Sequence, residues 1–99
     1  MKDYEKNGIL ASFEKALPLI DDPRVNDRDF GMVYGALSIS LESRISELKR
    51  GRIRSSGIEK ELEQLASVIN CFQSKINASK KEIMGRELMQ AYKIFSAIH

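Results

Sequence analysis

The sequence predicts an all-α protein, an antiparallel four-helix bundle with a short first helix. Apolar residues recur three and four positions apart in four segments, and no segment alternates apolar and polar residues as a half-buried strand would. Two of these segments follow the pattern S-x-x-E, in Ser56-Gly57-Ile58-Glu59 and in Ser79-Lys80-Lys81-Glu82. In such a capping box the serine oxygen accepts from the first helical turn, and the glutamate returns to the cap N–H. The two starts divide the second half of the chain into two helices.

The first helix is expected over about residues 3–17. Pro18 lacks a backbone N–H and clashes with the preceding turn, so regular helix should end near Leu17. The residues Asp21-Asp22-Pro23 are then expected to form a connection. The apolar positions of this helix are Ile9, Phe13, Ala16 and Ile20, with Leu10 and Leu17 beside them.

The second helix is expected to begin at Asn26 or Asp27, both good caps, with Asp29 in the first turn where the helix dipole favours an acid. A second apolar side predicts that this helix is central in the bundle. Gly31 and Gly35 form G-x-x-x-G, which predicts close packing against a neighbouring helix, since a membrane dimer would need a longer apolar segment. The main stripe consists of Phe30, Tyr34, Leu37, Leu41, Ile45 and Leu48. The second side consists of Met32, Val33, Ala36 and Ile39.

The third and fourth helices each carry a seam of apolar residues with coiled-coil-like spacing. Residues 74–78 between them are polar but contain no strong stop signal, so one merged helix from Ile58 to the end of the chain is the alternative. The third seam consists of Ile58, Leu62, Leu65, Ile69, Phe72 and Ile76. The fourth consists of Met84, Leu88, Ala91, Phe95 and Ile98.

Composition is that of a single soluble domain over residues 1–99. A formal net charge of +2 does not favour nucleic acid as a partner. A single cysteine, Cys71, suits a reducing cytoplasm. Residues 1–6 lack the apolar core of a signal peptide. The longest stretch without charge, residues 30–41, is shorter than the roughly 20 residues that cross a bilayer.

Few residues offer catalytic or metal-binding chemistry, so the chain is expected to be neither an enzyme nor a cofactor or metal protein. The single histidine, His99, is the last residue and is poorly placed to act as a general base. Cys71 has no second ligand at metal spacing and is expected to be a small buried apolar residue. Glu59 and Glu63 share a helix face, which is expected to be solvated.

A group of cations surrounds the loop before the third helix. We expect a solvated helix end whose cations are favoured by the helix dipole, with phosphate or headgroup contact as the alternative. No aromatic residue lies among the cations, which does not favour a stacking surface for single strands. The cations are Arg44, Lys49, Arg50, Arg52 and Arg54.

The fourth helix has apolar residues beyond its seam. With Phe95 toward the core, a 100° step per residue places Met89 nearly opposite and Tyr92 on a flank. Ile83 and Ile94 lie on the other flank. A contiguous exposed patch would mark a partner site, and a C-terminal helix is expected to have the fewest neighbours to cover it.

Three stretches resemble the immunity proteins of pediocin-like bacteriocins, the enterocin A immunity family. Asp22-Pro23-Arg24 lies between the first two helices, and Leu37 to Leu41-Glu42 is similar to the L-x-x-x-L-E close of a mid-chain helix. Gln73-Ser74-Lys75-Ile76-Asn77-Ala78-Ser79 resembles the N-K-I-x-F-[ST] turn before the last helix, with Ala78 in place of the usual bulky apolar residue. The chain ends at His99, whereas many members carry a tail after the last helix.

The resemblance implies a four-helix bundle and a cytosolic protector that is not an enzyme. Members act at the mannose permease, a membrane sugar transporter that the bacteriocin uses as its receptor, so this chain would lie in the cytoplasm or at the inner face of the membrane through that partner. The C-terminal half of a member sets which bacteriocin is blocked. The corresponding candidates here are Lys75, Met89, Tyr92, Lys93 and His99.

Two other classes of function remain open. A small helical adaptor or secretion chaperone would bind a partner helix through the same exposed apolar residues. A nucleic-acid-binding regulator would depend on the basic loop.

Overall fold

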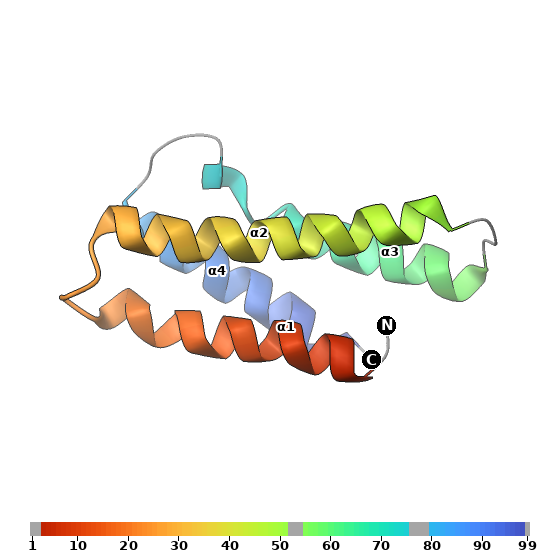
Figure 1. The fold of residues 1–99 in the computed structure, drawn as a ribbon, viewed down its shortest axis with the longest axis horizontal. Coiled ribbons are helices and arrows are strands. Elements are labelled where there is room, and N and C mark those ends of the chain that lie inside the picture. Colours follow the sequence, from red (N-terminus) through yellow and green to blue (C-terminus); the bar gives the residue numbers. More distant parts are fainter. Residues whose placement is uncertain (1–2, 52–54, 76–79, 99) are drawn as a thin grey trace.

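The computed structural model describes residues 3–51, 55–75 and 80–98, except for the side chain of Lys75. This part of the chain contains four α-helices, and consecutive helices run antiparallel (Figure 1). No strand occurs among the described residues, so the predicted all-α four-helix bundle is confirmed. The helices are α1 (Asp3–Ala16), α2 (Asp27–Arg50), α3 (Ser56–Ile69) and α4 (Lys81–Ser96), with short 3-10 helices η1 (Leu17–Asp21) and η2 (Gln73–Lys75).

The bundle is flat, with dimensions of 46 × 25 × 16 Å. Helices α2 and α4 pack against each other, and each also packs against α1 and α3. The central position predicted for the second helix is therefore confirmed. The division of the second half into two helices is also confirmed, because α3 ends at Ile69 and α4 begins at Lys81, with η2 between them (Figure 1). The alternative of one merged helix is wrong.

The end of α1 follows the prediction from Pro18. Regular α-helix ends at Ala16, and the chain continues as the 3-10 helix η1 with Pro18 in its first turn. Proline is tolerated there because the first N–H groups of a helix have no internal partner. The α-helix therefore ends one residue before the predicted boundary.

Side-chain caps begin α2 and α3. The Asn26 side chain accepts from the N–H of Asp29 at 2.8 Å, so Asn26 is the cap of the two predicted candidates, Asn26 and Asp27. At α3, the cap is Ser55, whose hydroxyl oxygen accepts from the N–H of Ile58 at 3.3 Å. The predicted cap at Ser56 is therefore wrong by one residue. Ser55 has extended backbone angles and Ser56 is already helical, so Glu59 lies one position too late to close the box.

The cap of α4 also differs from the prediction. Ser79 lies outside the described residues, and the cap position is Lys80, whose side chain makes no capping hydrogen bond. Instead, the N–H of Lys81 donates to the Asp27 carboxylate of α2 at 2.8 Å. The Lys81 Nζ atom donates to two backbone carbonyl oxygens of the connection before α2, at 2.7 Å each. The start of α4 is thus fixed by contacts with another part of the chain.

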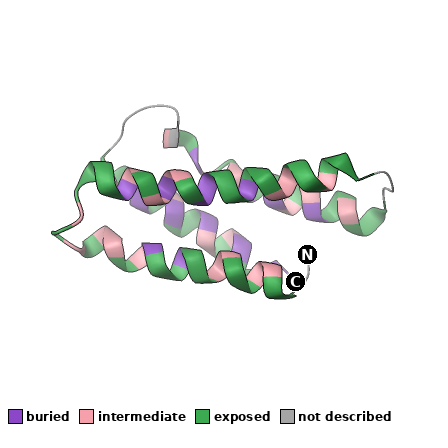
Figure 2. Ribbon diagram, viewed as in Figure 1, coloured by how far each residue is buried: buried purple, intermediate pink, exposed green. Residues whose placement is uncertain are grey.

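Aromatic rings form much of the core. The ring of Phe13 on α1 packs against α4, with its centroid 5.9 Å from that of Phe95. The ring centroids of Tyr34 and Phe72 are 5.0 Å apart. Buried residues concentrate where the helices face one another (Figure 2). Leu65 and Phe72 are buried as predicted, although Phe72 follows the end of α3 and is not part of a helical seam. Ile76, assigned to the same seam, lies outside the described residues.

Only part of the second apolar side of α2 is covered. Met32 is 69% exposed and Ile39 is 65% exposed, whereas Val33 is half-buried and packs against the core. Close packing at the glycine motif is partial. A Cβ at Gly31 would lie 3.8 Å from the methyl carbon of Met84 on α4, whereas a Cβ at Gly35 would meet no atom within 4 Å.

Candidate partner-binding surfaces

The outer face of α4 carries two of the predicted partner-binding residues. Met89 is 49% exposed, and Lys93 is exposed one turn later on the same side of the helix. Arg86 and Glu82 form an exposed ion pair on the same side. We call Met89 and Lys93 the outer α4 face; it combines an apolar side chain with a cation.

Tyr92 is half-buried and contributes to the packing of α4 on α1. Its ring centroid lies 5.7 Å from that of Phe13, and its hydroxyl lies 3.5 Å from a carboxylate oxygen of Glu14. Truncating Tyr92 would therefore disturb the core as well as the surface. A change at this residue cannot by itself test partner binding.

The reason given from sequence for choosing α4 is wrong. This helix packs against α1, α2, α3 and both 3-10 helices, so it does not have the fewest neighbours. Its other exposed apolar residue, Ile83, lies on the opposite flank from Met89. Of the remaining candidates, the Lys75 side chain and the whole of His99 lie outside the described residues.

An apolar groove between α1 and α2 was missed from the sequence. The hydroxyl of Ser12 donates to its own helix at the carbonyl of Gly8, and that of Ser40 donates to the carbonyl of Ala36. Both groove walls therefore present mainly carbon atoms. The signal in the sequence was the absence of charge over residues 30–41. The groove has a volume of about 270 Å³ and is lined by Ser12, Lys15, Val33, Ala36, Leu37 and Ser40.

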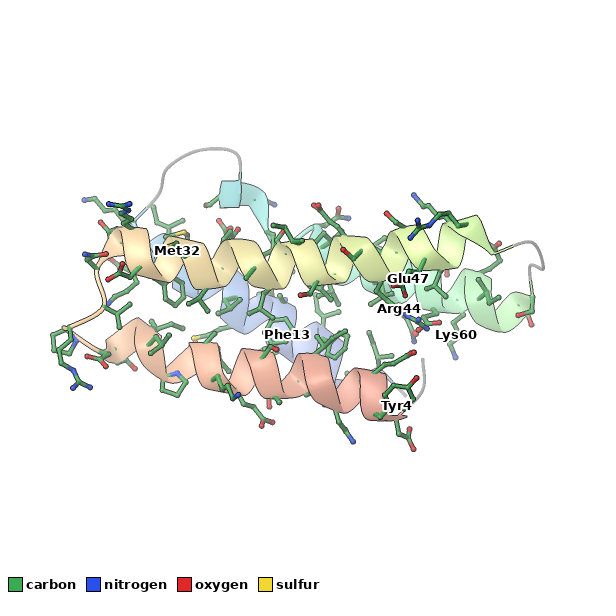
Figure 3. The ribbon with its side chains drawn as sticks, viewed as in Figure 1. Tyr4, Phe13, Met32, Arg44, Glu47 and Lys60 are labelled. Atoms are coloured by element: carbon green, nitrogen blue, oxygen red, sulfur yellow. The ribbon has the colours of Figure 1, made fainter. Side chains whose placement is uncertain are left out.

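Arg44 belongs to an ion-pair cluster and not to a basic surface. Its guanidinium nitrogens lie 3.1 Å from Glu5 of α1, 3.3 Å from Glu61 of α3 and 3.6 Å from Glu47 of α2. Its side chain is only 19% exposed. Figure 3 shows Arg44 and Glu47 near one end of the bundle. The expectation that Arg44 adds to a solvated basic end is wrong, because three carboxylates surround it.

The other cations of the basic loop do not form a uniform surface among the described residues. Lys49 and Arg50 are exposed at the end of α2, and Arg52 and Arg54 lie outside the described residues. Lys49 and Arg50 line an open depression of about 600 Å³ together with the carboxylate of Glu42. This mixture of charges does not favour an anion site.

A polar cluster joins the α3–α4 connection to α2 and α4. One carboxylate oxygen of Glu87 accepts from the Tyr34 hydroxyl and from the N–H of Ser74, the latter at 3.0 Å; the other accepts from the Ser74 hydroxyl at 2.7 Å. Burial alone would raise the pKa of Glu87, but these hydrogen bonds lower it below its usual range. Burial and the neighbouring carboxylate raise the pKa of Tyr34, so the phenol keeps its proton.

Of the residues considered for catalysis or metal binding, Cys71, Glu59 and Glu63 are described, and His99 lies outside the described residues. Burial raises the pKa of the Cys71 thiol, which lies 3.6 Å from the carbonyl oxygen of Ser67. Glu59 and Glu63 are exposed, as predicted. In residues 3–51, 55–75 and 80–98, no group of three His, Cys, Asp or Glu side chains is arranged to hold a metal ion.

Comparison with protein-family models, with curated proteins and with solved structures finds no match for this chain. Among the described residues, none of the helices combines the length and the apolar character needed to span a bilayer.

Proposed function

We propose that this chain is a bacteriocin immunity protein that acts by binding and not by catalysis. Its partner in this proposal is the membrane sugar permease that a pediocin-like bacteriocin uses as receptor, or the complex of the two, reached from the cytoplasm. The observation that supports it best is the outer α4 face in the C-terminal half. A half-exposed methionine beside a lysine offers an adaptable apolar contact with a charged neighbour.

The motifs behind the proposal agree with the fold in two places and depart from it in one. Asp22-Pro23-Arg24 lies between η1 and α2, and Gln73–Lys75 precedes α4. Leu41-Glu42 does not close a helix, because α2 continues to Arg50. The most specific motif, over residues 73–79, lies before α4, and its residues 76–79 lie outside the described residues.

The first test is protection of a sensitive cell. Expression of the chain in a sensitive Gram-positive host should allow growth in the presence of one or a few members of a panel of pediocin-like bacteriocins. No protection against the whole panel, with soluble protein present at a level comparable to a known protector, would contradict the proposed function.

The site is tested with two methionines in similar positions. Met89→Glu places a charge on the outer α4 face, and Met32→Glu places one on the outer side of α2, where the native side chain is even more exposed. Both variants should keep the helical circular dichroism signal and melting temperature of the parent. Protection should fall at least about tenfold in inhibitory bacteriocin concentration for Met89→Glu, about 1.4 kcal/mol of lost binding, and remain for Met32→Glu.

A small helical adaptor or secretion chaperone is the second candidate, and the groove between α1 and α2 favours it. Small side chains on the α2 wall would let a partner helix approach closely, with Val33 and Leu37 beneath it and Lys15 on the α1 wall. Ala36→Arg would fill this groove from an exposed helical position. Loss of protection in Ala36→Arg and Met32→Glu, but not in Met89→Glu, would move the binding site of an immunity protein to α2. The second candidate is favoured if the soluble parent protects against no bacteriocin of the panel.

A further inference from the structure

The described residues between α3 and α4 are hydrogen-bonded to α4 through one carboxylate, that of Glu87. The backbone-to-backbone hydrogen bonds of Cys71, Phe72 and Gln73 are local and join to the end of α3 or to one another. The hydrogen bonds to other helices come from Ser74, which bonds Glu87 on α4 and the Tyr34 hydroxyl on α2, and from the backbone of Gln73, which also bonds Glu87.

These hydrogen bonds lie beside the aromatic pair Tyr34 and Phe72 at an edge of the core. Tyr34 and Phe72 are each only 1% exposed, and their ring centroids are 5.0 Å apart. The ring of Tyr34 is part of the aromatic core, and its hydroxyl donates to Glu87, so Tyr34 belongs both to the core and to the polar cluster. Residues 73–75 pack against α2 and α4 at this point. Their position therefore decides how well this edge of the core is covered.

We propose that Glu87 is a latch: its ionised carboxylate holds residues 73–75 against the bundle, and neutralising it releases them as a local unit while the four helices stay packed. The ionised carboxylate of Glu87 accepts hydrogen bonds from both hydroxyls and from the Ser74 N–H. A protonated carboxyl carries an O–H on one oxygen, so it accepts fewer hydrogen bonds, and one of these hydroxyl donors must find another acceptor. Hydrogen bonds to a charged group are also roughly twice as strong as neutral ones. This inference does not depend on the proposed function.

The groups that face Glu87 set the direction of the pH dependence. These are the Tyr34 phenol from α2 and the Cys71 thiol from the connection, both of which keep their protons at neutral pH because burial raises their pKa values. Among the described residues, no cation forms an ion pair with Glu87. Because the pKa of Glu87 is lower in the folded protein than in the unfolded chain, the latch is closed at neutral pH and is lost only as the pH falls below the usual range of a glutamate carboxyl.

Amide hydrogen exchange tests the latch. In Glu87→Gln at pH 7, the amide of Ser74 should exchange about 10- to 100-fold faster than in the parent, as expected for loss of hydrogen bonds to a charged group. The amides of Leu65 and Leu88 in the packed helices should change much less. The matched control is Glu82→Gln, the same substitution on the exposed side of α4, which should leave Ser74 unchanged.

Two results would overturn the latch. One is an unchanged Ser74 exchange rate in Glu87→Gln; the other is an acceleration at Ser74 that the core amides share equally, which would mean global unfolding only. If Glu87→Gln does not fold, the parent is measured from pH 7 to pH 3 after correction for intrinsic exchange rates. Ser74 should then lose protection before Leu65 and Leu88, and simultaneous loss would contradict local release.

Discussion

At the scale of single residues, Phe72 is the sharpest test of the core. It follows the end of α3, yet its side chain is 1% exposed and its ring packs against Tyr34. Phe72→Ala should lower the free energy of unfolding by about 3–5 kcal/mol through loss of buried area and formation of a cavity. Denaturant unfolding at neutral pH measures this, with Phe72→Leu as a control that retains more volume and should cost less. A loss below about 1 kcal/mol for Phe72→Ala would mean that Phe72 is not part of the packed core.

Helical geometry predicts which single residues of α4 are exposed, but not their tertiary partners. A 100° step from Phe95 correctly placed Met89 outward and Tyr92 on a flank, because that step depends only on the helix itself. The contact of Tyr34 with Glu87 spans 53 positions in the sequence. No local pattern encodes such a contact, so the polar cluster at the α3–α4 connection could not be predicted.

At the scale of elements, Asp27 has two roles: it lies in the first turn of α2, and it accepts from the first N–H of α4. Asp27→Ala should lower the free energy of unfolding by about 0.5–2 kcal/mol, as expected for loss of a capping oxygen. Asp27→Asn, which keeps an oxygen in the same position, should restore part of that loss. Equal stability of Asp27→Ala and the parent in thermal and denaturant unfolding would show that α4 does not need this cap.

The boundaries of the helices show where sequence patterns are sufficient. Asn26 was one of two adjacent residues predicted as the cap of α2, and its side chain caps a donor only three positions away, which a local pattern can reveal. Ser55 and Ser56 are adjacent, so the S-x-x-E spacing favoured the wrong serine. At α4 the capping oxygen comes from Asp27, which is distant in sequence, and a search for local caps could not find it.

At the scale of the whole molecule, polar contacts join the helices at three levels of a flat bundle. Arg44 links α1, α2 and α3 near one end, Lys81 and Asp27 join the starts of α4 and α2 at the other, and Glu87 lies between them. The all-α class was predictable from periodicity. The exposure of Met32 and Ile39 was not, because periodicity identifies an apolar side but does not reveal whether a neighbour covers it.

The proposals for α4 depend on its being a separate helix that folds back along α3. Spin labels on cysteines at the exposed positions Glu59 and Ser96, in a chain with Cys71→Ala, measure this directly by electron–electron double resonance. The antiparallel bundle predicts a distance well below the 46 Å length of the molecule. One merged helix would separate the two positions by about 55 Å at 1.5 Å per residue, and a distance near that value would contradict the fold and the outer α4 face together.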